Sequence, residues 1–177
     1  MKKLEIFFDY FCPYCLKGHE QLVRFVKDSS IKDSSSKDNS ALELIWHPCE
    51  IYKLPGNIYA TKRTDNCIQG MYFAAESNAD LWRYHQRVYD LIYAEKVNVE
   101  DIDTFTKSFE GFLDVEAFGC ALKAGKYRND VSEANHFAFQ KTGVNVVPTY
   151  RADGGFLQDR QEFFNMGHSN TAYGGTK

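Results

Sequence analysis

The hydrophobic pattern at the start of the chain changes from a continuous run to a helical spacing. Residues 3–10 (KLEIFFDY) are mostly aromatic or aliphatic, which predicts a buried β-strand. Pro13, which a helix tolerates in its first turn, opens a segment with apolar residues three or four positions apart. Those residues are Leu16, Leu22, Val23 and Val26. Residues 41–48 alternate and end in proline, so the pattern predicts a strand–helix–strand unit with a right-handed crossover.

The middle of the chain, residues 57–142, has helical periodicity and almost no strand signal. Three apolar stripes predict three amphipathic helices. Their members are Leu81, Tyr84, Val88, Leu91 and Ile92, then Ile102, Phe105 and Phe109, and then Val115, Phe118 and Leu122. Asp114 and Asn129 are predicted to cap successive helices, and Gly143 to be the glycine that follows the last one.

Strand character returns after this helical block. Residues 144–158 contain β-branched valines and an Asp-Gly-Gly turn at 153–155, which predict a β-hairpin. The polar, serine-rich residues 27–40 predict a surface loop, and residues 160–177 offer at most a short final helix.

The order of these elements predicts the α/β class. Residues 1–56 and 143–177 are expected to form one domain, which residues 57–142 interrupt as an all-helical insertion. The 177 residues, 44% of them apolar, are enough for one sizeable core.

Charge and hydropathy narrow the range of partners. The net charge of −3 gives no general affinity for nucleic acid or anionic membranes, and no apolar run approaches the roughly 20 residues of a membrane span. Glu5 and Asp9 interrupt the first apolar run and no small-residue cleavage site follows it, which argues against a signal peptide and favours the cytoplasm.

Five cysteines remain to be explained, two of which form a Cys-Pro-Tyr-Cys motif at residues 12–15. Such a pair has three interpretations in a reducing compartment: two ligands of a metal site, a structural disulfide, or a redox pair. A structural zinc site needs four ligands, but the chain has no second pair of this kind and its five histidines have no metal-binding spacing, so we expect no metal. Cys49, Cys67 and Cys120 are expected to be small buried apolar residues.

The position of Cys12 and Cys15 at a helix start predicts different chemistry for the two thiols. Unpaired amides and the helix dipole favour the thiolate of Cys12, so it is expected to be an exposed nucleophile with a lowered pKa. Cys15, one turn further along, is expected to be buried and to resolve the mixed disulfide that Cys12 forms. Apart from this redox-active disulfide, no cofactor is expected.

Four further residues are candidates for contact with substrate. Pro148 lies in a strand-like segment where proline belongs at a strand start or edge, and a cis bond there would expose the backbone of Val147 to an extended peptide. Pro13 and Tyr14 separate the two cysteines and would shape access to them.

Asp9 has two interpretations: a buried carboxylate that moves protons for Cys15, or a cap of the turn before the helix.

Together, FFDYFCPYC, the helical block and GVNVVPTY resemble a DsbA-like member of the thioredoxin superfamily. The match is closest to the cytoplasmic FrnE-type branch, because Asp9, the Cys-Pro-aromatic-Cys motif and Gly18 fit its pattern, although Cys49 replaces an aromatic residue. This resemblance implies a thioredoxin fold with a large helical insertion, a cis Pro148 that faces the cysteine pair, and thiol–disulfide oxidoreductase activity. Family members usually end in a clear amphipathic helix, which residues 160–177 do not show.

Relatives in the same superfamily leave a second activity open. Glutathione-dependent isomerases and kappa-class glutathione transferases bind a glutathione thiolate without cycling a dithiol, and a pure transferase needs no Cys15. The presence of both cysteines favours redox chemistry on protein disulfides or small-thiol disulfides, with glutathione as a candidate partner.

Overall fold

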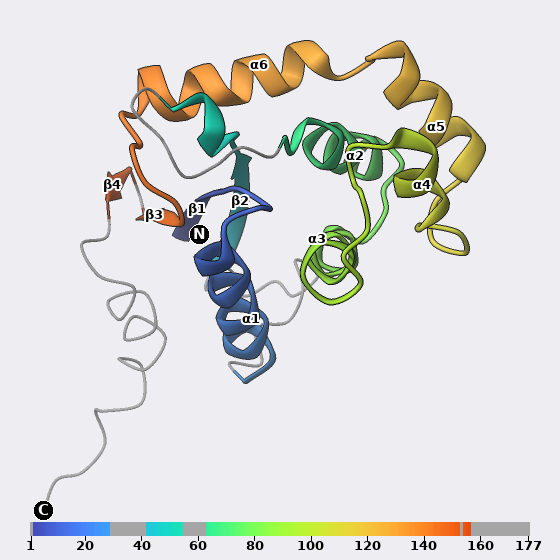
Figure 1. Ribbon diagram of the computed structural model, residues 1–177. Coiled ribbons are helices and arrows are strands. Elements are labelled where there is room, and N and C mark those ends of the chain that lie inside the picture. Colours follow the sequence, from blue (N-terminus) through green and yellow to red (C-terminus); the bar gives the residue numbers. More distant parts are fainter. Residues whose placement is uncertain (1, 29–41, 55–62, 153, 157–177) are drawn as a thin grey trace, which may run out of the picture.

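A computed structural model gives the fold, and it describes residues 2–28, 42–54, 63–152 and 154–156 (Figure 1). The strands are β1 (Lys2–Phe8), β2 (Leu42–Pro48), β3 (Thr149–Ala152) and β4 (Gly155–Phe156). The α-helices are α1 (Pro13–Asp28), α2 (Asp65–Glu76), α3 (Leu81–Tyr89), α4 (Ile102–Lys107), α5 (Val115–Ala124) and α6 (Arg128–His136). A short 3₁₀ turn, η1 (Ile51–Lys53), follows β2, and π-helical turns η2 (Asp90–Ala94) and η3 (Phe137–Lys141) extend α3 and α6.

The four strands form one mixed sheet in the order β2-β1-β3-β4. β1 pairs in parallel with β2, while β3 runs antiparallel to both β1 and β4. Ile6 lies at the centre of the sheet, because its register partners are Trp46 on one side and Tyr150 on the other. The predicted strand–helix–strand unit, α/β class and C-terminal hairpin are therefore confirmed.

Successive residues of β1 point to opposite faces of the sheet, so they pack against different helices. Phe7 stacks on His47 of β2, with ring centroids 4.7 Å apart, and on Phe137 of η3 at 6.1 Å. Phe8 packs edge-on against Trp46, whose ring lies 6.3 Å from that of His19 in α1. α1 and the α6–η3 segment consequently cover opposite faces of the sheet (Figure 1).

The helical block is joined to the sheet through α3 as well as α6. His85 of α3 packs against Trp46, with centroids 4.4 Å apart, and its Nδ1 shares a 2.8 Å hydrogen bond with the hydroxyl of Tyr10. Both His85 and Tyr10 are buried, so this contact lies inside the continuous core. The division of the chain into two domains at residues 57 and 142 stays a prediction.

The predicted helical stripes are confirmed, since Tyr84, Val88, Phe105 and Phe118 are among the most buried side chains. Two capping predictions are also confirmed. Asp114 accepts a 3.0 Å hydrogen bond from the amide of Ala117 at the start of α5, and Gly143 adopts a positive φ of 71° after η3.

Three local expectations differ from the structure. Asn129 does not cap α6, because the helix begins one residue earlier at Arg128, and the amide of Arg128 bonds back to the carbonyl of Gly125. β1 stops at Phe8, because the amides of Phe11 and Cys12 fold back onto Asp9 and end the ladder. Residues 144–148 are not strand either, since β3 begins only after Pro148, which has no amide to donate.

Some predictions lie outside the described residues: most of the loop at 27–40, residues 153, 157 and 158 of the predicted hairpin, and the segment 160–177. Within the part of the chain that the structure describes, no helix combines the length and apolar character needed to cross a membrane.

Candidate active site

The cysteine motif forms the first turn of α1, as predicted. The carbonyl of Cys12 accepts hydrogen bonds from the amides of Cys15, at 2.9 Å, and Leu16, at 3.2 Å. Cys12 is thus the N-cap residue, and Pro13 occupies the first helical position, where its missing N–H costs nothing. The amide of Cys12 donates to the carbonyl of Asp9 at 3.2 Å, which fixes the turn between β1 and α1.

The two thiols differ in electrostatics far more than in exposure. Cys12 is only 6% exposed and Cys15 3%, so the expected exposed position of Cys12 is wrong: neighbouring segments cover its sulfur. A hydrogen bond from the Cys15 thiol, supported by the amides of Cys15 and Tyr14, lowers the pKa of Cys12 to about 7 against the cost of burial. Burial and the same hydrogen bond, which Cys15 donates, raise the pKa of Cys15 well above its usual value.

The segment that covers Cys12 comes from 135 residues away in the sequence. The thiol of Cys12 donates a hydrogen bond to the carbonyl of Val147 at 3.5 Å. The Val147–Pro148 peptide bond is cis, which confirms the sequence-based expectation. Val147 is buried, while the preceding Val146 is 61% exposed. The loop before β3 therefore forms one wall of the site.

Gly18 allows this loop to lie close to α1. A Cβ atom at Gly18 would collide with the hydroxyl of Tyr150 in β3 and would lie 3.6 Å from Cγ of Pro148. A glycine on this face of the helix leaves room for the hydroxyl end of Tyr150 and for the ring of Pro148. The sequence pattern included Gly18, and the structure supplies its physical reason.

Asp9 caps the turn before α1, as one of the two interpretations of the sequence expects, and its role as a proton carrier stays a prediction. Its carboxylate is 1% exposed and accepts hydrogen bonds from the amides of Phe11, at 2.9 Å, and Ile51, at 2.7 Å. Burial raises its pKa to about 6, although these two amides and the hydroxyl of Thr64 oppose the shift. Its negative charge in turn raises the pKa of both Cys12 and Cys15. Asp9 is therefore a cap of the turn and a titratable group coupled to the cysteine pair.

Sequence reasoning missed the part of the site that follows β2. Glu50 is completely buried, and the next residue, Ile51, supplies the amide that holds Asp9. Cys49 precedes them, with its amide 2.8 Å and its sulfur 3.6 Å from the carbonyl of Phe8. The available signal was a glutamate two residues after the end of a strand, next to a cysteine expected to be buried, where an unpaired charge would be costly.

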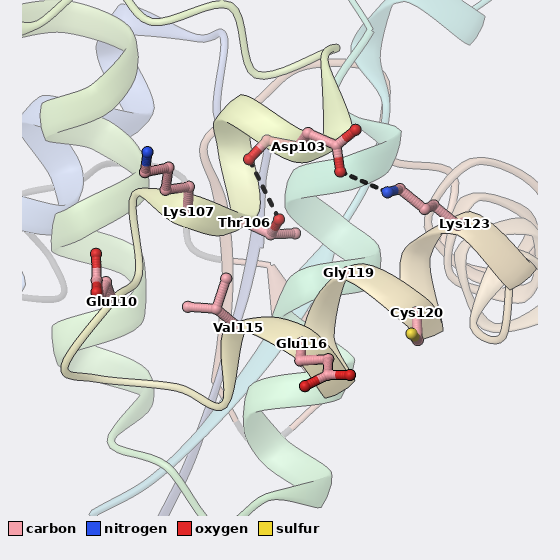
Figure 2. A pocket seen from close by; sticks show the side chains of 9 residues that line it. All are labelled: Asp103, Thr106, Lys107, Glu110, Val115, Glu116, Gly119, Cys120 and Lys123. Carbon is pink, nitrogen blue, oxygen red and sulfur yellow. Dashed lines mark hydrogen bonds and ion pairs between the residues drawn. The ribbon is translucent and has the colours of Figure 1, made fainter.

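The remaining cysteines divide into two environments. Cys49 and Cys67 are fully buried, as predicted, and burial raises the pKa of both thiols well above the usual value. Cys120 is exposed, so the prediction of a buried residue is wrong there: it lies on the outer side of α5 in a groove beside α4 (Figure 2). Acidic and basic side chains line this groove, including the Asp103–Lys123 ion pair at 2.5 Å.

The surface around the cysteine pair is partly apolar. Tyr14, between the cysteines, is 58% exposed, and Pro13 is exposed beside it. Val146 adds a second exposed apolar side chain from the opposite wall. Within residues 2–28, 42–54, 63–152 and 154–156, no group of three or more histidine, cysteine or carboxylate side chains is arranged to hold a metal ion.

The different pKa values predict selective alkylation of Cys12. At pH 7 about half of Cys12 should be thiolate, against a few per cent for an ordinary cysteine. The rate at which iodoacetamide alkylates Cys12 should therefore reach half of its maximum near pH 7, while Cys15 should stay unlabelled until far higher pH. A Cys120→Ser background removes the exposed competing thiol, and peptide mass mapping identifies the product. Faster labelling of Cys15 would contradict this assignment.

Comparisons with known proteins agree with this geometry. The family model of the DSBA-like thioredoxin domain matches residues 3–168. A curated relative, the uncharacterized protein YwbO of Bacillus subtilis (strain 168), is 23% identical over 181 residues, covering 83% of this chain and 84% of the relative.

Solved structures of low sequence identity share the fold. A probable DsbA oxidoreductase from Streptomyces coelicolor superposes with a TM-score of 0.68 at 17% identity, covering all of this chain and 93% of its own. A 2-hydroxychromene-2-carboxylate isomerase gives 0.71 at 14% identity, with coverage of 95% and 94%. The fold expected from the resemblance, a DsbA-like thioredoxin fold, is confirmed. Because the family model spans every element from β1 to β4, the chain belongs to the DSBA-like thioredoxin domain family.

Proposed function

We propose that the protein is a thiol–disulfide oxidoreductase in which Cys12 is the nucleophile and Cys15 the resolving thiol. The observation that carries this proposal is the opposite shift of two thiol pKa values within one helical turn. The thiolate is the nucleophile in disulfide exchange, so a Cys12 that is half ionised at pH 7 is suited to attack. Cys15, held protonated by burial, becomes reactive only after Cys12 has been consumed.

The proposed cycle proceeds in two exchanges. The Cys12 thiolate attacks one sulfur of a substrate disulfide, which forms a mixed disulfide and releases the other sulfur as a thiolate. Cys15 then loses its proton and attacks Cys12. The Cys12–Cys15 disulfide forms, the bond to the substrate breaks, and the substrate leaves reduced. With a dithiol substrate the same steps run in reverse and the substrate is oxidised.

Asp9 is suited to handle the proton of the second exchange. A carboxyl group whose pKa is about 6 can accept and return a proton at neutral pH, and its charge already acts on both thiols. The carbonyl of Val147 is freed earlier, when Cys12 loses its thiol proton before the first exchange and can no longer donate to it. The backbone of this loop, with Pro13, Tyr14 and Pro148, would then contact an extended protein substrate.

A glutathione-dependent isomerase or kappa-type glutathione transferase is the alternative, and the solved isomerase supports it at the level of the fold. Such an enzyme would use Cys12 to hold or polarise a glutathione thiol without closing a disulfide. The low-pKa, high-pKa pair at Cys12 and Cys15 favours the redox activity instead. The FrnE-type branch, the cytoplasmic location and protein or small-thiol substrates are part of the same proposal.

Equilibration of the protein with glutathione buffers of known ratio tests the proposal. We expect the Cys12–Cys15 pair to change between dithiol and disulfide in one two-electron transition, followed by the mass of alkylated protein. The oxidised protein should also transfer its disulfide to a reduced dithiol peptide. A protein that binds reduced glutathione without forming a disulfide, and whose Cys12 and Cys15 stay reduced across the series, would instead support the transferase alternative.

A further inference from the structure

Glu50 is a completely buried carboxylate that the proposed cycle does not use. Its Oε2 accepts a 2.8 Å hydrogen bond from Nδ2 of Asn135 and forms an ion pair with Nζ of Lys53. Its own amide donates to Oδ1 of Asn135 at 2.7 Å. A single asparagine of α6 therefore holds both the main chain and the side chain of Glu50. A buried charge is retained only with such partners, since an unpaired carboxylate would cost several kcal/mol.

The peptide group that follows Glu50 leads directly to the site. The amide of Ile51, which belongs to the peptide bond with Glu50, donates to Oδ2 of Asp9 at 2.7 Å. This short link is held on one side by Asn135 and on the other by Asp9. The two ends of the network lie in α6 and in the turn that leads into α1, and these two helices cover opposite faces of the sheet (Figure 1).

The charge of Glu50 also acts on Asp9. The negative charge is one of the influences that raise the pKa of Asp9, after the larger effect of burial. Among the described residues, Asp9 also acts on several thiols and phenols: Cys12, Cys15, Cys49, Cys67, Tyr10, Tyr89 and Tyr93. Apart from Cys12, their raised pKa values keep them uncharged at pH 7. Cys12 carries no charge while it is held in a mixed disulfide, so Glu50, with Lys53 as its counter-ion, is a charged neighbour that can tune Asp9 in that state.

We propose that Glu50 is a positioning residue for proton exchange between Asp9 and the Cys12–Cys15 pair, an inference that rests on the proposed oxidoreductase function. With Asn135 it fixes the Ile51 amide on Asp9, and its charge makes Asp9 ready to take up the proton that Cys15 releases. When Cys15 attacks, the Cys12–Cys15 bond forms, the substrate leaves as a thiolate, and the proton of Cys15 passes to Asp9. Asp9 then returns that proton to the departing thiolate or to water.

Two substitutions with opposite expected signs test this role. Glu50→Gln keeps the size of the side chain and removes the negative charge, so Asp9 should titrate at lower pH than in the unmodified protein. Lys53→Gln removes the counter-ion and leaves the charge of Glu50 uncompensated, so Asp9 should titrate at higher pH. Each shift should be on the order of half a pH unit. Glu43→Gln, at the far end of β2 and paired with Lys3, is the matched control and should change nothing.

The readout is the carboxyl ¹³C resonance of Asp9 in the reduced full-length protein, assigned by its disappearance in Asp9→Asn. The rate at which Cys15 resolves a preformed mixed disulfide, followed against pH, should shift in the same directions. If Glu50 contributed only to structure, Glu50→Gln would lower the stability of the fold, but the two variants would not shift the Asp9 titration and the resolution rate in opposite directions.

The outcome also separates this inference from the proposed function. If Asp9 titrates unchanged in Lys53→Gln, or in the same direction in both variants, the role of Glu50 is overturned even though the pair cycles. If the unmodified protein does not cycle, the proposed function fails whatever the titration shows. Should Glu50→Gln not fold, Lys53→Gln decides alone, because that side chain is 43% exposed and its loss leaves the core intact.

Discussion

The Cys15→Ser protein should accumulate covalent adducts with its substrates. Cys12 can still attack a disulfide, but no thiol one turn away can break the resulting bond. Cys12 also loses the hydrogen bond from the Cys15 thiol that most lowers its pKa, although a serine hydroxyl can replace that donor. We therefore expect turnover to fall to the uncatalysed rate while adduct formation persists. Affinity capture followed by release with dithiothreitol measures the adducts.

The matched control for this trap is Cys12→Ser. It removes the nucleophile and leaves Cys15, whose raised pKa makes it a poor substitute, so few adducts should form. Both variants belong in a Cys120→Ser background, since Cys120 is the exposed cysteine among the five. Equal adduct yields from the two variants would show that attack occurs at another cysteine and would refute the assignment of Cys12.

Gly70→Ala should be the most damaging single-methyl substitution in the helical block. A Cβ at this position in α2 would overlap the hydroxyl of Tyr84 and lie 2.8 Å from Cζ of Phe118. Both rings are fully buried, and the Tyr84 hydroxyl donates to the carbonyl of Cys67 at 2.7 Å, so neither can move freely. Overpacking of this kind costs about 1–3 kcal/mol, and loss of the buried hydrogen bond adds about 1 kcal/mol or more.

Gly119→Ala adds the same methyl group but is expected to raise the stability of the protein. Gly119 lies in α5, and a Cβ there would meet only Oγ1 of Thr106, at an ordinary distance of 3.7 Å. Replacing a helical glycine by alanine should stabilise the protein by up to about 1 kcal/mol. Urea unfolding of both variants measures the difference. A Gly70→Ala protein as stable as Gly119→Ala would mean that α2 and α3 are not packed as described.

Much of the secondary structure could be predicted from the sequence because it depends on residues that are close to one another along the chain. The apolar run before Cys12, the helical spacing after Pro13 and the stripe that includes Tyr84 are periodic patterns, and periodicity determines which face of an element is buried. The lowered pKa of Cys12 also follows from local geometry, since Cys12 is an N-cap residue and Cys15 lies one turn further along, whereas the raised pKa of Cys15 comes mainly from burial.

The environment of the site, in contrast, was decided by tertiary contacts. Sequence pattern placed Asp9 close to the cysteines, but only the folded chain brings it the amide of Ile51, 42 residues away. Residues far apart share this core, so no local period encodes their contacts. For the same reason the expected exposure of Cys12 was wrong, because the loop at Val147 covers its sulfur.

The sequence by itself therefore determined most of the helices and strands, their order along the chain and the position of the cysteine pair at a helix start, since each appears as a local pattern. Tertiary structure alone decided that Asn135 of α6 would bind Glu50 and that Cys120 would remain on the surface. Burial of a charge or a thiol depends on which distant segments pack over it, and that packing exists only once the whole core has formed.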